Sequence, residues 1–294
     1  MFQQLLATQF WKSVLHRFER DEVFGRAAQL SYYFLLALFP LLIFLITLFG
    51  YFNGAGNLQQ QLISYLGRVM PSAALQLVVS TIDEVTRSRG SAKLSFGIVF
   101  ALWAASSGVN ALAEGLNAAY DVRESRTWWK VRLVAIAITI ALSVLIISAL
   151  SIVLYGGRLG ESVANSIDAG IVFELVWKIL QWPIAIGFLL LALVLIYRFV
   201  PDVGAKRQGR GLPASDYRQR WFSPGVLIAV VLWLIVSLGF RLYLHFFNSY
   251  SATYGSLGAL IILMLWFYLT GAVILLGAEI NSEYEQRAKG KASE

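Results

Sequence analysis

The stretch YGSLGALIILMLWFYLTGAVILLGAEINSEYE, Tyr254–Glu285, decides the fold class. No charged side chain occurs between Tyr254 and Ala278. At 1.5 Å per residue, a helix of this length crosses a hydrocarbon core of roughly 30 Å. Glu279 and Asn281 follow directly. They are either solvated residues at a helix end or members of a buried polar site, and only the second interpretation makes them functional candidates.

The composition of the whole chain also indicates a membrane protein. Of 294 residues, 58% are hydrophobic and 14% are charged, whereas soluble domains carry about 25% charged residues. The chain has no cysteine, which excludes disulfides, thiolate zinc sites and cysteine nucleophiles.

Five further apolar runs precede the quoted stretch, and none of them alternates with the period of two that a membrane strand requires. They lie within Leu30–Phe52 and at Leu94–Ala113, Leu133–Tyr155, Ile179–Tyr197 and Trp221–Phe240, with Tyr254–Ala278 as the sixth. The sequence therefore predicts an all-α polytopic membrane protein with six transmembrane helices.

The distribution of basic residues predicts the orientation of these helices. With the N-terminus inside, 17 of the 24 Lys and Arg residues fall in cytoplasmic segments, as the positive-inside rule requires. We therefore expect a multi-pass protein of the bacterial inner membrane with both termini cytoplasmic. The net charge of +7 is then explained by loops that meet anionic lipid rather than nucleic acid.

Two amphipathic segments flank the predicted spans. Residues 1–28 form a predicted cytoplasmic arm, in which Phe2, Leu6, Phe10, Val14 and Phe18 recur every four residues. This pattern is typical of a helix lying in the plane of the inner leaflet. The membrane domain is predicted over 29–282 and the cytoplasmic tail over 283–294. Within the membrane domain, the periplasmic loop 53–93 is predicted to hold two short amphipathic helices that cover the bundle or gate it.

Polar residues near the predicted cytoplasmic ends of the spans are candidates for a substrate site. Their spacing places Asn110, Glu114 and Asn117 on one face of the second span. The sixth span runs in the same direction, and the first span opens at that side. The sequence thus predicts one polar cluster, whose members are Arg26, Gln29, Asn110, Glu114, Asn117, Glu279 and Asn281. The alternative is that these residues are solvated helix ends or structural links between helices.

A second group of polar residues lies on the predicted outer side. Arg241 and His245 are four residues apart on one helix face, and Tyr254 opens the sixth span. These side chains are expected either to bind an anionic headgroup or to extend toward the membrane interface.

Enzymatic chemistry finds little support in the sequence. The two histidines, His16 and His245, are predicted on opposite sides of the membrane, and no zinc motif, GxSxG motif or phosphate-binding glycine loop occurs. We expect no enzyme, no metal and no cofactor, and membrane lipids as partners.

The first functional hypothesis is a transporter or flippase-like protein for a lipid or amphipathic anion. The alternatives are a non-transporting membrane scaffold and, remotely, a ribonuclease.

Four stretches of the chain resemble the YihY/BrkB family of bacterial inner-membrane proteins. They are RAAQLSYYFLLALFPLL (Arg26–Leu42), GVNALAEGLNAAYDVRESRTWWKVRL (Gly108–Leu133), YRFVPD (Tyr197–Asp202) and YSATYGSLGALIILMLWFYLTGAVILLGAEINSEYE (Tyr250–Glu285). The resemblance implies a six-helix integral membrane protein, linked by name to virulence and discussed in some members as a candidate transporter. Family members have also carried the label ribonuclease BN, which looks like a misassignment. The resemblance supplies no settled set of catalytic residues.

Overall fold

The structure is a computed structural model that describes residues 8–53, 79, 92–166, 170–202, 223–246 and 256–290. The described part contains long helices and no β-strand, so the all-α prediction is confirmed. The helices are α2 (Thr8–Arg20), α3 (Val23–Asn53), α6 (Ala92–Ala119), α7 (Trp128–Ser166), α8 (Gly170–Phe199), α9 (Pro224–Phe246) and α11 (Ser256–Gly290). The predicted amphipathic loop 53–93 lies almost entirely outside the described residues.

Each of the six predicted spans coincides with one helix. Four helices contain a segment long and apolar enough to cross a membrane, namely Trp128–Ile152, Ile179–Phe199, Pro224–Leu244 and Leu260–Ala288. Helices α3 and α6 cover the first two predicted runs, and their crossing of the membrane stays a prediction.

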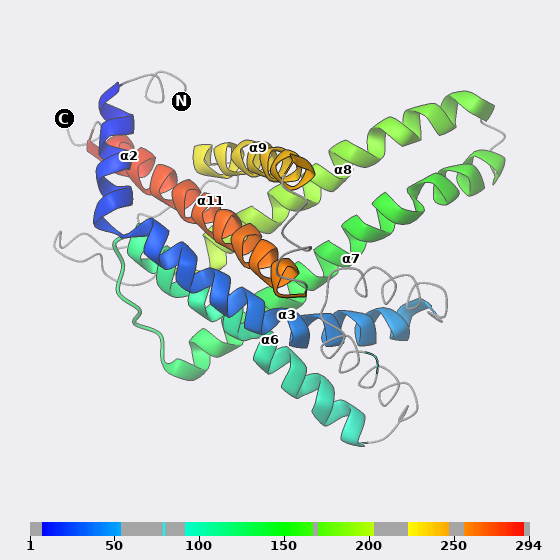
Figure 1. The fold of residues 1–294 in the computed structure, drawn as a ribbon, viewed down its shortest axis with the longest axis horizontal. Helices are drawn as coiled ribbons and strands as arrows, with labels where there is room; N and C mark the ends of the chain where they lie inside the picture. The colour runs from blue at the N-terminus through cyan, green and yellow to red at the C-terminus, as the bar shows by residue number, and fades with distance from the viewer. Residues whose placement is uncertain are drawn as a thin grey trace.

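Helix α11 lies at the centre of the fold and packs against α2, α3, α6 and α9. Figure 1 shows α3 and α6 side by side along it, and α2 across its C-terminal end. Central packing explains why Leu275, Ala278 and Ile280 are almost completely buried. Helix α2 and the C-terminal end of α11 therefore lie at one end of the described structure, while the side of the membrane that this end faces stays a prediction.

Helices α9 and α11 cross at a pair of glycines. A Cβ atom on Gly225 would collide with the carbonyl oxygen of Gly277 and lie 2.5 Å from Asn281 Oδ1. A Cβ atom on Gly277 would collide with the Tyr197 hydroxyl and lie 2.9 Å from Ala229 Cβ. Small residues are common where membrane helices approach backbone to backbone. Helix α9 begins at Pro224, and proline is favoured at the first position of a helix.

Helix α2 only partly follows the prediction of an in-plane amphipathic helix. Phe10 and Val14 are buried against Ile280 of α11, so this part of the apolar face covers protein rather than lipid. Trp11 and Leu15, on the adjoining part of the apolar face, are 43% and 59% exposed. The physical reason is that α11 continues to Gly290 instead of ending at Ala278, and its last turns give α2 a surface to pack on.

Candidate functional site

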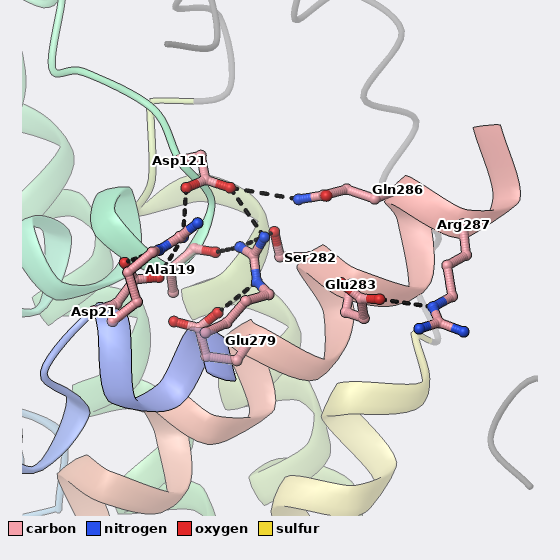
Figure 2. A network of polar contacts seen from close by, with 10 residues as sticks. Asp21, Ala119, Asp121, Glu279, Ser282, Glu283, Gln286 and Arg287 are labelled. Carbon is pink, nitrogen blue, oxygen red and sulfur yellow. Dashed lines mark hydrogen bonds and ion pairs between the residues drawn. The ribbon is translucent and has the colours of Figure 1, made fainter. Parts of the chain in front are cut away.

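A buried arginine joins three helices at the end of the described structure where α2 crosses α11. The Arg17 guanidinium of α2 donates to Glu279 Oε2 of α11 at 3.0 Å and to Ser282 Oγ at 2.8 Å. It also donates to Asp121 Oδ2 at 3.0 Å and to the Ala119 carbonyl at 2.7 Å, both at the C-terminal end of α6. We call these five residues the Arg17 network, and Figure 2 shows its acidic and carbonyl partners around a common centre.

Local sequence explains how these groups meet. Arg17 follows Val14 by three residues, so it lies on the buried face of α2. Ser282 follows Glu279 by three residues on α11, which places both on one helix face. Helix α6 ends in a Schellman motif, in which the Val122 N–H donates to the Asn117 carbonyl and the Asp121 N–H to that of Ala118, both at 2.9 Å.

The Schellman motif gives Asp121 a left-handed backbone, with φ 53°. That conformation is uncommon outside glycine, although aspartate tolerates it better than most residues. It turns the chain sharply at the end of α6. The Asp121 carboxylate then accepts from Arg17, from Arg20 at 2.7 Å and from Gln286 at 3.4 Å.

Additional contacts tie α2 to the last turns of α11. Arg287 donates to Glu283 at 2.6 Å, to the Gln9 carbonyl at 2.8 Å and to Ser13 Oγ at 2.9 Å. Figure 2 shows the Glu283–Arg287 pair beside the Arg17 network. The segment predicted as a tail therefore continues the helix as far as Gly290 and contributes to packing.

Glu279 is buried, but the arginine predicted to accompany it is the wrong one. Its side chain is 0% exposed, which decides against a solvated helix end. Arg26 donates instead to the main-chain oxygen of Asp21 at 2.8 Å. Arg26 was predicted because it lies where the first span begins. The sequence did not show that α2 folds back over α11 and brings Arg17 to Glu279.

Asn281 is buried as well, and it caps another helix. Its Oδ1 accepts from the Gly225 N–H at 2.7 Å, in the first turn of α9, and its Nδ2 donates to the Tyr120 hydroxyl at 3.4 Å. The first N–H groups of a helix have no partner within that helix. Asn281 of α11 therefore acts as a cap supplied by a neighbouring helix.

Asn117 belongs to a separate network beyond the end of α6. It donates to Glu124 Oε2 at 2.9 Å and accepts from the Asp202 N–H at 2.8 Å. The Asp202 carboxylate in turn accepts from the N–H and hydroxyl of Ser125. Asn117 and Glu279 therefore share no described hydrogen-bond partner, and Asn117 belongs to the loop that follows α6 rather than to the Arg17 network.

Both carboxyls of this second network are stabilised in the ionised form. Burial acts to raise the pKa of Glu124, but hydrogen bonds from Arg126 and Asn117 outweigh it and lower the pKa below its usual value. Burial likewise acts to raise the pKa of Asp202, but hydrogen bonds from Ser125 outweigh burial, and the pKa lies below its usual value. The loop between α6 and α7 is therefore held by charged acceptors.

Glu114 and Gln29 are both exposed, which contradicts their place in a buried cluster. On α6, Glu114 continues a single open face that also holds half-buried Ser107 and Asn110 and 40%-exposed Trp103. The other α6 residues from Ser106 to Ala119 are mostly buried. Asn110 and Glu114 thus share one outward-facing side of the helix, whereas Asn117, predicted on the same face, is buried.

Arg132 of α7 lies at one end of this open face. Its guanidinium is 4.2 Å from the centre of the Trp103 ring, donates to the Trp103 carbonyl and lies 3.3 Å from Ser107 Oγ. We call Trp103, Ser107, Asn110, Glu114 and Arg132 the polar stripe. From Trp103 to Glu114, eleven residues of helix extend it over about 16 Å.

The outer group is described only in part. Arg241 is exposed on α9, and the side chain of His245 and all of Tyr254 lie outside the described residues.

Sequence reasoning missed Arg17, Asp121, Ser282 and Arg132. Only Arg17 carried a local signal, because it is a charged residue on the apolar stripe of an amphipathic helix. In the described part of the chain, no group of three or more His, Cys, Asp or Glu residues is arranged to hold a metal ion.

Comparison with known proteins shows relatives along nearly the whole chain. A Bacillus subtilis (strain 168) protein named ribonuclease-like protein YfkH is 36% identical over 280 residues, covering 95% of this chain and 96% of the relative. A UPF0761 membrane protein of Xanthomonas campestris pv. campestris (strain B100) is 27% identical over 273 residues, covering 93% of this chain. The chain spans 60% of that Xanthomonas protein. No solved structure matches.

The family model described as Virulence factor BrkB matches residues 14–294, which include the Arg17 network and the polar stripe. This match confirms the resemblance found in the four sequence stretches. The chain is a membrane protein and belongs to the BrkB family.

Proposed function

We propose that the protein moves a lipid or an amphipathic anion across the bacterial inner membrane. The observation that carries this proposal is the polar stripe, an outward-facing row of side chains on a helix whose other residues from Ser106 to Ala119 are mostly buried. Polar groups on an open face within a membrane are costly. They are expected where a polar substrate passes.

The chemistry of the stripe suits a lipid headgroup. Moving a headgroup through hydrocarbon is unfavourable, because its hydrogen-bonding groups lose their partners. Arg132 at one end supplies a guanidinium, the side chain best suited to phosphate. Asn110 and Glu114 supply acceptors and donors further along the helix, about 10 Å and about 16 Å from Trp103. A headgroup can follow this row while its acyl chains stay in the bilayer.

The test is lipid exchange between the leaflets of reconstituted vesicles. Fluorescent phosphatidylglycerol on the inner leaflet should become accessible to an external quencher faster in vesicles with the wild-type protein than in protein-free vesicles. The double variant Asn110→Leu, Glu114→Leu should slow the exchange. Glu19→Leu, which removes an exposed carboxylate on α2, is the matched control and should leave the rate unchanged. Wild-type exchange no faster than in empty vesicles rejects the proposal.

The other two functions are separated by further measurements. A folded wild-type protein without lipid exchange, together with a stable cross-linked protein partner, would favour the membrane scaffold. The ribonuclease wording belongs to the Bacillus relative, and we propose that this chain is not an enzyme. RNA cleavage by the purified protein with added divalent metal, lost on substitution of its carboxylates, would contradict that view.

A further inference from the structure

The two oxygens of the Glu279 carboxyl have different surroundings. Oε2 accepts from Arg17 Nε at 3.0 Å. Oε1 is buried and accepts no hydrogen bond from any described residue. A buried, ionised oxygen without a donor is costly, because it has lost water and gained nothing in return.

Figure 2 shows the side chain of Asp21 beside that of Glu279. Asp21 is held in place by the α2–α3 turn, in which Glu22 has φ 49° and Arg26 donates to the Asp21 carbonyl. The Asp21 side chain is only 13% exposed. Two neighbouring carboxylates repel each other, whereas two carboxyl groups that share one proton form a hydrogen bond.

The surrounding cations are engaged elsewhere. Arg17 is shared between Glu279 and Asp121, and Arg20, 45% exposed, donates to Asp21 and Asp121. On the other elements, Arg26 of α3 binds a main-chain oxygen, and Arg287 of α11 pairs with Glu283. None of them donates to Glu279 Oε1. A proton is therefore the ligand that fits between the two carboxyls.

We propose that Asp21 and Glu279 bind one proton between them, and that this proton holds α2 against α11. Loss of the proton leaves two facing carboxylates in a buried site and drives the α2–α3 turn away from α11. This inference does not depend on lipid transport.

Infrared spectroscopy of the detergent-purified protein tests the bound proton directly. At neutral pH the wild type should show the C=O band of a protonated carboxyl, shifted in heavy water. Glu279→Gln and Asp21→Asn should each remove the band, since the proton is shared, while Glu283→Gln should keep it. Absence of the band in the wild type, or its survival in Glu279→Gln, overturns the proposal.

Thiol accessibility tests the consequence for α2, and the cysteine-free chain makes each introduced thiol unique. Val14→Cys, at a buried position facing α11, should become more accessible to a thiol reagent as the pH rises, relative to exposed Lys12→Cys on the same helix. The ratio corrects for the reactivity of thiolate itself. In a Glu279→Gln background the ratio should stay constant with pH. A wild-type ratio that does not change with pH overturns the role of the proton in holding α2.

Discussion

The Arg17 guanidinium of α2 binds groups at the end of α6 and on α11, whereas α7 and α8 pack against each other and contribute apolar residues such as Ile138 and Leu193 to the core. In Figure 1 the α7–α8 pair extends away from the end where α2 crosses α11. Buried polar side chains of α7 form hydrogen bonds within their own helix. The Thr139 hydroxyl, for example, donates to the Ala135 carbonyl.

The difference lies in how each region responds to a local change. A buried ion network fails when one member is removed, because the remaining charges lose their partners. An apolar interface loses free energy in proportion to the area uncovered, about 25 cal/mol per Å².

Arg17→Ala should produce the largest loss of stability. Removing one partner of a buried pair costs about 3–5 kcal/mol, and here it leaves Glu279 and Asp121 without their shared guanidinium. Thermal unfolding of the detergent-purified protein measures the loss, with exposed Lys12→Ala as the control on the same helix. Equal melting temperatures for the two variants would show that the network contributes nothing to stability.

Gly225→Ala should come next, because its Cβ would meet the Gly277 carbonyl and the Asn281 side chain. Overpacking of this kind costs about 1–3 kcal/mol. Gly239→Ala on the same helix is the matched control, since no described residue lies within 4 Å of its added Cβ. Similar melting temperatures for Gly225→Ala and Gly239→Ala would contradict the close crossing of α9 and α11.

Asn281→Ala should cost less, about 1–2 kcal/mol, because it removes the acceptor for one N–H group of α9. Asn281→Asp keeps the acceptor and adds a negative charge at a helix N-terminus, where it is favourable. Unfolding measurements should therefore rank Asn281→Asp above Asn281→Ala. The reverse order would exclude a capping role.

Acid should loosen the loop between α6 and α7. Because the pKa values of Glu124 and Asp202 are lowered in the folded protein, their stabilising effect is present above the pKa of the unfolded chain and is lost as pH falls through the folded pKa. The protection of the amides of residues 122–126, measured as exchange relative to an unstructured chain at the same pH, should fall at acid pH. Because Glu124 is exposed, screening keeps its share of the effect modest. Asn117→Ala should lower this protection already at neutral pH, and unchanged protection in acid would contradict this prediction.

The fold was predictable from sequence to a large extent. Apolar runs located the helices, since length and hydropathy are local properties. The end of α11 was not predictable in the same way. Glu279 and Asn281 interrupt the apolar run, and the helix continues to Gly290 with Glu279 buried against α2 and Asn281 against the start of α9.

The candidate site was predictable in part. Glu279 and Asn281 were recognised as polar residues in an unusual position, and both are buried. Their partners depend on which helices touch. Arg17 and Glu279 are 262 residues apart in the sequence, and no local pattern shows that they bind each other. Helical periodicity correctly joined Asn110 to Glu114 but could not decide whether their shared face points inward or outward.

The smallest effect is expected at the exposed surface of α8. Leu180 is 44% exposed and Leu193 is 5% exposed on the same helix. Leu180→Ala should change the free energy of unfolding by no more than about 0.5 kcal/mol in detergent. Leu193→Ala should cost about 2–5 kcal/mol. Thermal unfolding of the two variants gives the comparison. An equally large loss for Leu180→Ala would mean that this face of α8 packs against protein, because lipid or detergent fills the space left by a truncated side chain and a protein partner does not.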